Sequence, residues 1–223
     1  MYFRDRADAG RQLATKLNTY AGSPNLIVLA LPRGGVPVGF EVAQALGAPL
    51  DVFLVRKLGV PGHEELAMGA VASGGTRVLN RDVVDALHIS AADIEAVAAR
   101  EQAELDRRER AYRDERPAPE VRGKTVIVVD DGLATGSSMR AAAAALRQRA
   151  PARLVIGVPT AAPRTCHELR AEVDDIVCAI TPEPFYAVGV WYQDFSQTTD
   201  EEVRDLLARA AAAHEQRRRD RAA

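Results

Sequence analysis

Residues 126–139 have the sequence Val-Ile-Val-Val-Asp-Asp-Gly-Leu-Ala-Thr-Gly-Ser-Ser-Met, and this stretch decides the fold of the chain. The apolar run 126–129 predicts a strand buried on both faces of a parallel sheet. Asp130 and Asp131 follow at its carboxyl end, where open α/β folds bind their ligands. Residues 134–138 form a small, hydroxyl-rich turn ahead of a predicted helix over 139–149. Backbone amides and a helix N-terminus therefore converge on an anion site.

The acids and the turn are complementary to two parts of one ligand. Paired carboxylates can accept hydrogen bonds from vicinal sugar hydroxyls or hold a hydrated Mg²⁺. The turn suits a phosphate monoester, so the two together predict a sugar phosphate ligand. The alternative is a plain strand-turn-helix in which Asp130 and Asp131 only cap the helix.

The stretch resembles the phosphoribosyl pyrophosphate signature of the type I phosphoribosyltransferases: four apolar residues, two acids, two small or apolar residues and a Thr-Gly-centred phosphate loop. Gly132 departs from the usual apolar residue, which we interpret as a loosened turn. The resemblance implies that Asp130 and Asp131 contact the ribose hydroxyls, and that Mg²⁺ carried by phosphoribosyl pyrophosphate reaches them through water. It also implies a 5-phosphate loop made of Ala134, Thr135, Gly136, Ser137 and Ser138.

A second loop follows the apolar strand predicted at 26–31. Pro32-Arg33-Gly34-Gly35 precedes a predicted helix over 36–46, which Gly47 stops. The two glycines let the backbone close on a ligand, and Arg33 supplies a guanidinium fork for phosphate. The loop resembles the family's pyrophosphate loop, which commonly contains a cis peptide, placed here near Pro32-Arg33. An ordinary glycine-rich turn is the alternative.

A third predicted strand, residues 51–55, ends in Arg56 and Lys57. These cations are either a solvated pair or, as the resemblance implies, neutralise pyrophosphate. The implied pyrophosphate set is therefore Arg33, Gly34, Gly35, Arg56 and Lys57. Arg33, Asp130 and Asp131 are the implied catalytic residues, acting by positioning and charge stabilisation.

Two excursions interrupt the alternation of strands and helices. The glycine-rich residues 58–75 match the family's flexible β lid, with His63, Glu64 and Glu65 in it as exposed polar residues. Residues 80–116 predict a helical insertion with N-caps at Asn80 and Ser90. Its thin apolar stripe and dense charge predict a helix that stands off the core or meets a partner subunit, so a homodimer is a hypothesis.

The remaining pattern completes an α/β fold. A strand at 154–158, a helix at 163–171 and a strand at 176–180 predict a type I phosphoribosyltransferase-like parallel sheet flanked by helices on both faces. We predict one domain over 1–223 with the following parts: core 26–195, helical insertion 80–116, a small hood from 1–20 and 182–198, a C-terminal helix 199–215, and then a solvated, disordered basic tail at 217–219.

The segment 182–198 is rich in aromatic residues, which suits either a packed hood or a platform for a flat heterocycle. By resemblance to purine phosphoribosyltransferases, Tyr186, Trp191 and Gln193 fall near base-covering positions; core packing is the equal alternative. Ala134 stands where 6-oxopurine enzymes have an acidic residue, and no Lys follows the strand near 158–159. A guanine or hypoxanthine acceptor is therefore not favoured.

Composition narrows the function classes. The chain has 223 residues, 47% of them hydrophobic, and a net charge of −2, so no basic field suggests nucleic acid. No membrane-length apolar run or signal segment appears, and a cytoplasmic location is expected. Cys166, Cys178 and the four scattered histidines lack metal-ligand spacing, so we predict no structural metal, and a disulfide is the less favoured alternative for the two cysteines.

The resemblance implies an enzyme of nucleotide or nucleoside metabolism. It would transfer ribose 5-phosphate from phosphoribosyl pyrophosphate to a nitrogenous base, with Mg²⁺ as cofactor. Two other functions remain open: a non-catalytic sensor of phosphoribosyl pyrophosphate or a nucleotide, and a hydrolase or phosphorylase of a ribose phosphate.

Overall fold

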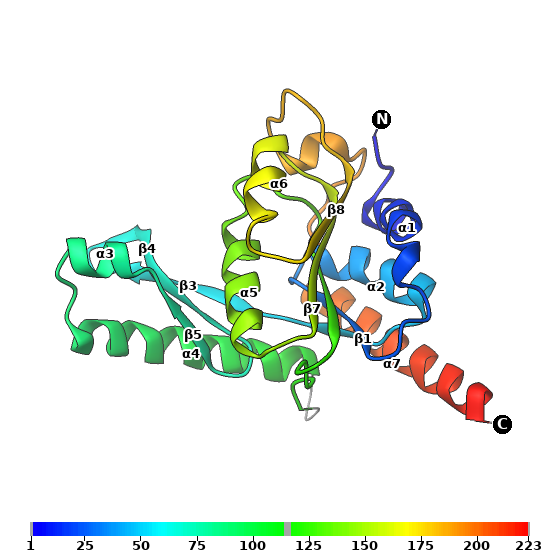
Figure 1. The fold of residues 1–223 in the computed structure, drawn as a ribbon, viewed down its shortest axis with the longest axis horizontal. Helices are drawn as coiled ribbons and strands as arrows, with labels where there is room; N and C mark the ends of the chain where they lie inside the picture. The colour runs from blue at the N-terminus through cyan, green and yellow to red at the C-terminus, as the bar shows by residue number, and fades with distance from the viewer. Residues whose placement is uncertain (1, 114–116, 223) are drawn as a thin grey trace.

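A five-stranded parallel sheet forms the centre of the structure, a computed structural model that describes residues 2–113 and 117–222 (Figure 1). The strand order is β2-β1-β6-β7-β8, and every neighbouring pair is parallel. The strands are β1 (Leu26–Ala30), β2 (Leu50–Val52), β6 (Thr125–Val129), β7 (Arg153–Thr160) and β8 (Asp175–Ile180). The predicted parallel α/β sheet is confirmed.

Helices cover both faces of this sheet. Because side chains alternate along a strand, Val28 packs toward one core and Ile27 toward the other. The first core includes residues of α1 (Arg6–Lys16), α2 (Gly35–Leu46) and α7 (Asp200–Ala222). The second includes residues of α5 (Ser137–Gln148) and α6 (Pro163–Leu169). A short 3₁₀ turn, η1 (Asn18–Tyr20), follows α1.

A separate antiparallel sheet occupies the region predicted as the lid. Its strands are β3 (Val55–Val60), β4 (His63–Ala72) and β5 (Thr76–Leu79), and it extends to one side of the parallel sheet (Figure 1). The predicted strand 51–55 is wrong, because β2 ends at Val52 and the chain enters the second sheet at Val55. Arg56 and Lys57 therefore lie inside β3 and not at the end of a core strand.

The helical insertion consists of α3 (Arg81–Ala86) and α4 (Ala91–Arg113), while residues 114–116 of the predicted insertion lie outside the described residues. Both predicted N-caps are confirmed: Asn80 accepts a hydrogen bond from the Val83 amide, and Ser90 accepts one from the Asp93 amide. The apolar stripe of α4 packs against β3, β4 and α7. Its burial is thus satisfied within the chain.

The two segments predicted as a hood meet each other. Phe3 pairs with Tyr192 in an isolated parallel bridge, next to the 3₁₀ turn η2 (Val188–Trp191). The predicted disordered tail is wrong, because α7 continues through residues 217–219. The final residues are mostly Ala, Arg, Glu and Gln, which favour helix, and Arg217 donates a 2.9 Å hydrogen bond to the Gln44 carbonyl.

Among the described residues, no helix is both long enough and apolar enough to cross a bilayer.

Candidate functional site

The strand order places two loops beside one crevice. From β1 the chain moves outward to β2, and it later returns to the other side of β1 as β6. Such a reversal separates the loops at the carboxyl ends of the two adjacent strands and opens a ligand crevice there. The loop 32–35 follows β1, and the stretch 130–136 follows β6. The structure therefore brings together the two motifs that the sequence singled out.

The first loop passes very close to the acid pair. A Cβ atom on Gly34 would lie 2.0 Å from Asp131 Oδ2, and one on Gly35 would lie 2.7 Å from the Val129 carbonyl oxygen. A side chain at position 35 would collide with the backbone of β6, and one at position 34 would displace the Asp131 carboxylate. The Pro32-Arg33 peptide is cis, as the resemblance implied.

Ionisation of the acid pair, Asp130 and Asp131, is unfavourable in this environment. Burial, and then the neighbouring Asp131 charge, raise the pKa of Asp130 well above its ordinary value. Burial also raises the pKa of Asp131, although a hydrogen bond from Arg6 opposes the rise. Arg6 extends from α1, and its Nε lies 2.9 Å from Asp131 Oδ2. Two adjacent carboxylates with one such counter-ion are poised to attract a cation or hydroxyl donors.

The hood also reaches Asp131. The Tyr192 hydroxyl donates a 2.6 Å hydrogen bond to the Asp131 carbonyl oxygen. The Arg6 guanidinium lies 4.0 Å from the Phe195 ring centroid and donates to the Ser196 carbonyl. The N-terminal helix and the hood thus converge on one acid. The sequence did not single out Arg6 or Tyr192, because neither belongs to a local motif.

The predicted phosphate loop has the geometry of an anion site. Gly136 adopts φ of +72° immediately before α5, a conformation that favours glycine. Thr135 Oγ1 and Ser137 Oγ lie 3.1 Å apart, and Thr135, Ser137 and Ser138 are exposed. The Ala134 carbonyl accepts a 2.6 Å hydrogen bond from the Thr165 hydroxyl of α6. This hydrogen bond holds the loop in place, and the hydroxyls and the start of α5 are accessible to a ligand.

Gly132, the departure from the family pattern, has a packing role. A Cβ atom there would lie 2.5 Å from Val188 Cγ1 in the hood. This glycine therefore does more than loosen the turn, because it lets η2 approach the acid pair closely.

A small cavity of about 110 Å³ lies beside the acid pair. Its lining includes Arg33 of the first loop, Arg56 of β3, Arg108 of α4 and Asp130. The structure therefore places Arg33 and Arg56, two of the predicted pyrophosphate ligands, at one cavity. The insertion helix adds Arg108, which belongs to none of the predicted site motifs.

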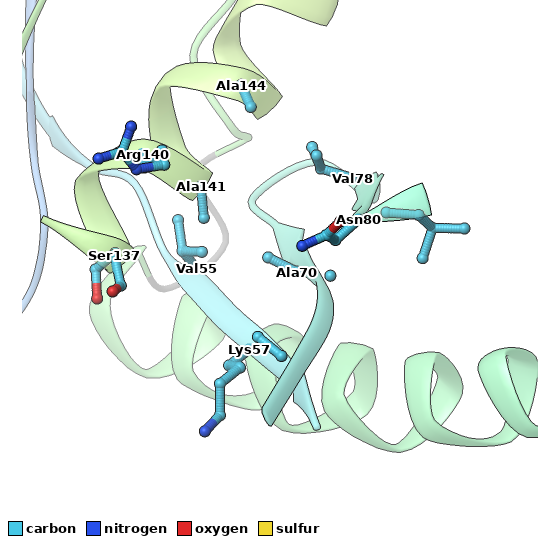
Figure 2. A pocket seen from close by; sticks show the side chains of 13 residues that line it. Val55, Lys57, Ala70, Val78, Asn80, Ser137, Arg140, Ala141 and Ala144 are labelled. Atoms are coloured by element: carbon cyan, nitrogen blue, oxygen red, sulfur yellow. The ribbon is translucent and has the colours of Figure 1, made fainter. Parts of the chain in front are cut away.

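A second cavity of about 560 Å³ lies between the lid sheet and α5 (Figure 2). Figure 2 shows Ala141 and Ala144 of α5 on one side of it and Val78 on the other. Val55 and Ser138 line both cavities, so the two are neighbours.

The lid strand β3 separates the two predicted cations. Lys57 lines the larger cavity and Arg56 the smaller one, as the alternation of side chains along a strand requires. Lys57 Nζ lies 3.8 Å from Glu65 Oε2. The pyrophosphate role of Lys57 stays a prediction, and Arg56 is the one that faces Arg33.

The three predicted base contacts lie in the hood. Trp191 stacks on Tyr2 at 5.8 Å and on Phe185 at 6.5 Å between ring centroids. Its buried Nε1 has no hydrogen-bond partner among the described residues. Tyr186 and Gln193 are exposed. Base contact stays a prediction for all three.

Comparison with known proteins shows similarity over most of the chain. The profile of the Phosphoribosyl transferase domain matches residues 3–192. Two Mycobacterium tuberculosis proteins with the provisional name phosphoribosyl transferase, MT0597 and Rv0571c, are 46% identical over 208 residues, which is 93% of this chain and 47% of each relative. The chain thus spans about half the length of these curated relatives. The crystal structure of TT1426 from Thermus thermophilus is 44% identical with a TM-score of 0.84, covering 94% of this chain and 99% of that one.

Proposed function

This chain belongs to the phosphoribosyl transferase domain family, and we propose that it transfers ribose 5-phosphate from phosphoribosyl pyrophosphate to a nitrogenous base. One observation carries the proposal. The acid pair at the end of β6 continues directly into the loop 134–138 at the start of α5, and it faces the arginine-bearing loop 32–35 across the crevice. A sugar that carries phosphate on one side and pyrophosphate on the other matches this sequence of acids, amides and guanidinium groups.

Each part of the site has a role in this reaction. The loop 134–138 would hold the 5-phosphate with its amides and hydroxyls. Asp130 and Asp131 would accept hydrogen bonds from the ribose hydroxyls. Arg33 and Arg56 would bind the pyrophosphate, whose negative charge grows as it departs from the anomeric carbon. Because the transition state is oxocarbenium-like, catalysis would rest on positioning and on fixed charges.

The residues present fit Mg²⁺ brought by the substrate. No group of three or more His, Cys, Asp or Glu side chains suited to a metal occurs within residues 2–113 and 117–222. Mg²⁺ commonly takes one or two carboxylates and completes its shell with substrate phosphates and water. Asp130 and Asp131 can supply that share, directly or through water. The ion would neutralise the pyrophosphate charge.

The acceptor would bind under the hood. The stacked Trp191 and Tyr2 rings provide a flat apolar surface. Ala134 leaves the phosphate loop without a carboxylate that could assist a base nitrogen. These features support a nitrogenous ring as the acceptor class.

The test is pyrophosphate release from phosphoribosyl pyrophosphate with Mg²⁺ and a panel of purine, pyrimidine and other nitrogenous bases. Base-dependent release is expected from the wild type, and D130N/D131N should abolish it while the protein stays folded. D82N/D85N is the matched control, because these exposed acids of α3 lose the same charge outside the site. Turnover retained in D130N/D131N would exclude the assigned role. Binding without release for every base would point to a sensor instead.

A further inference from the structure

The small cavity beside the acid pair carries an excess of positive charge. Arg33, Arg56 and Arg108 line it, and Asp130 is the one acid among its lining residues. The arginines come from three separate elements: the loop after β1, the lid strand β3 and the insertion helix α4. The site thus combines a core loop with both excursions from the core.

Each arginine is held by an acid that does not line the cavity. Arg56 Nη2 lies 2.6 Å from Glu101 Oε2, and Arg108 Nε lies 2.8 Å from Glu104 Oε1. Arg33 Nη1 lies 3.7 Å from Asp200 Oδ1. These pairs orient the arginine side chains, and none of the three paired acids lines the cavity.

The pairs leave the arginines able to take another partner. The side chains of Arg56, Arg33 and Arg108 are 28%, 37% and 48% exposed. Solvent screening keeps such partly exposed ion pairs weak. A guanidinium binds a phosphate through two parallel hydrogen bonds, and a single group can contact carboxylate and phosphate together. A polyphosphate can therefore recruit all three.

Helix α4 is anchored so that Arg108 keeps its position. Leu105 and Tyr112 on the same helix are buried, and the Tyr112 hydroxyl donates a 2.6 Å hydrogen bond to Asp200 Oδ1. Arg113 is buried in ion pairs with Asp51 and Glu109 and donates to the Val52 carbonyl. The insertion is therefore a fixed wall of the cavity.

We propose that Arg108 is a further anion-binding residue, and that the helical insertion completes the subsite for the pyrophosphate group of the substrate. The inference rests on the proposed function, since it names a residue for the same reaction. It assigns to α4 a role that the two loop motifs do not contain. The ligand class is a diphosphate, either as the leaving group of the donor or as the free product.

The probe is inorganic pyrophosphate with Mg²⁺, titrated by calorimetry into the full chain. R107Q is a matched control, because Arg107 contacts the same Glu104 from the same helix and carries the same charge, but does not line the cavity. R108Q should weaken binding about tenfold, the loss of one charged hydrogen-bonding group. R108K should recover part of the affinity, and R107Q should stay within about twofold of the wild type.

Thermal melts accompany each variant; the exposed Arg108 side chain predicts no loss of fold. Equal weakening in R107Q and R108Q would overturn the inference, since a general field would then explain the binding. Undiminished binding in R108Q with tight binding in the wild type would also overturn it, while leaving the proposed function intact. If the wild type binds no pyrophosphate, the proposed function fails together with the inference.

Discussion

Replacing Asp130 with Asn should make the protein more stable while destroying its proposed activity. Asp130 Oδ1 accepts a 2.8 Å hydrogen bond from the Asp131 amide, and an Asn side chain of the same shape retains that acceptor. What disappears is a charge that burial and Asp131 disfavour. Removing one such strained group commonly stabilises a protein by about 1–2 kcal/mol. For a chain of this length, each kcal/mol raises Tm by about 2–4 °C.

The pH dependence follows from the raised pKa of Asp130. The native state holds the proton more tightly than the unfolded state, so stability falls as pH rises from about 3.9, the unfolded value, to the raised folded value. D130N removes this loss. The Tm difference between D130N and the wild type should therefore be near zero below about pH 4 and grow to its full size above the folded pKa.

Differential scanning calorimetry in buffers free of Mg²⁺ and phosphate measures the effect. D51N is the matched control, because Asp51 pairs at 2.8 Å with the buried Arg113. The same substitution there should cost about 2 kcal/mol, less than the full breakage of a buried pair because Asn keeps an acceptor oxygen. A D130N protein that melts at or below the wild type at about pH 8 would refute the reasoning.

Three further predictions concern the surroundings of the site. R6Q should destabilise the protein by about 1–2 kcal/mol at pH 8 and less at pH 4, because Asp131 loses its counter-ion; paired melts at the two pH values check this. G132A should cost about 1–3 kcal/mol by forcing the stiff Val188 aside, seen as a lower Tm and faster proteolysis of the hood; an unchanged melt would contradict it. Diamide should oxidise Cys166 and Cys178, whose sulfurs lie 2.8 Å apart, to a disulfide, and mass spectrometry should detect the loss of two hydrogens. If both thiols can still be alkylated after treatment, the pairing is disproved.

The predicted reactivity of that cysteine pair has a local cause. The contact with Cys178 and the nearby Arg170 charge outweigh burial and lower the pKa of the Cys166 thiol to about 7. The thiolate is the form of cysteine that starts disulfide formation. At neutral pH a substantial fraction of Cys166 is therefore in the reactive form.

Sequence patterns were sufficient where the relevant residues are neighbours along the chain. The strand 126–129, the acids and the loop 134–138 form one continuous segment, so their spacing already contains their geometry. The loop 32–35 was equally accessible. Its place opposite the acids depends on the strand order β2-β1-β6, which the structure shows and the sequence patterns did not predict.

Contacts made across long sequence separations could not be predicted in this way. Arg6 lies 125 residues from Asp131, and Tyr192 lies 61 residues from it. Nothing in their local sequence distinguishes them from other arginines and tyrosines. Arg108 is one of many charged residues on α4. The apolar stripe of this helix did not indicate which part of the molecule its charged faces would approach. The predicted strand 51–55 was drawn too long because Phe53 and Leu54 are apolar and buried like strand residues. In the structure they belong to the connection between β2 and β3.

Strand β3 lies between two cavities that differ in polarity. Arg56 lines the arginine-rich cavity and Lys57 the more apolar one, while Val55 lines both. A displacement of β3 would therefore be expected to change the shape of both cavities. We expect an apolar small molecule bound beside α5 to push β3 toward the smaller cavity and narrow it without contacting Arg33, Arg56 or Arg108. Such a compound would inhibit the proposed reaction although it shares no charged group with the substrate.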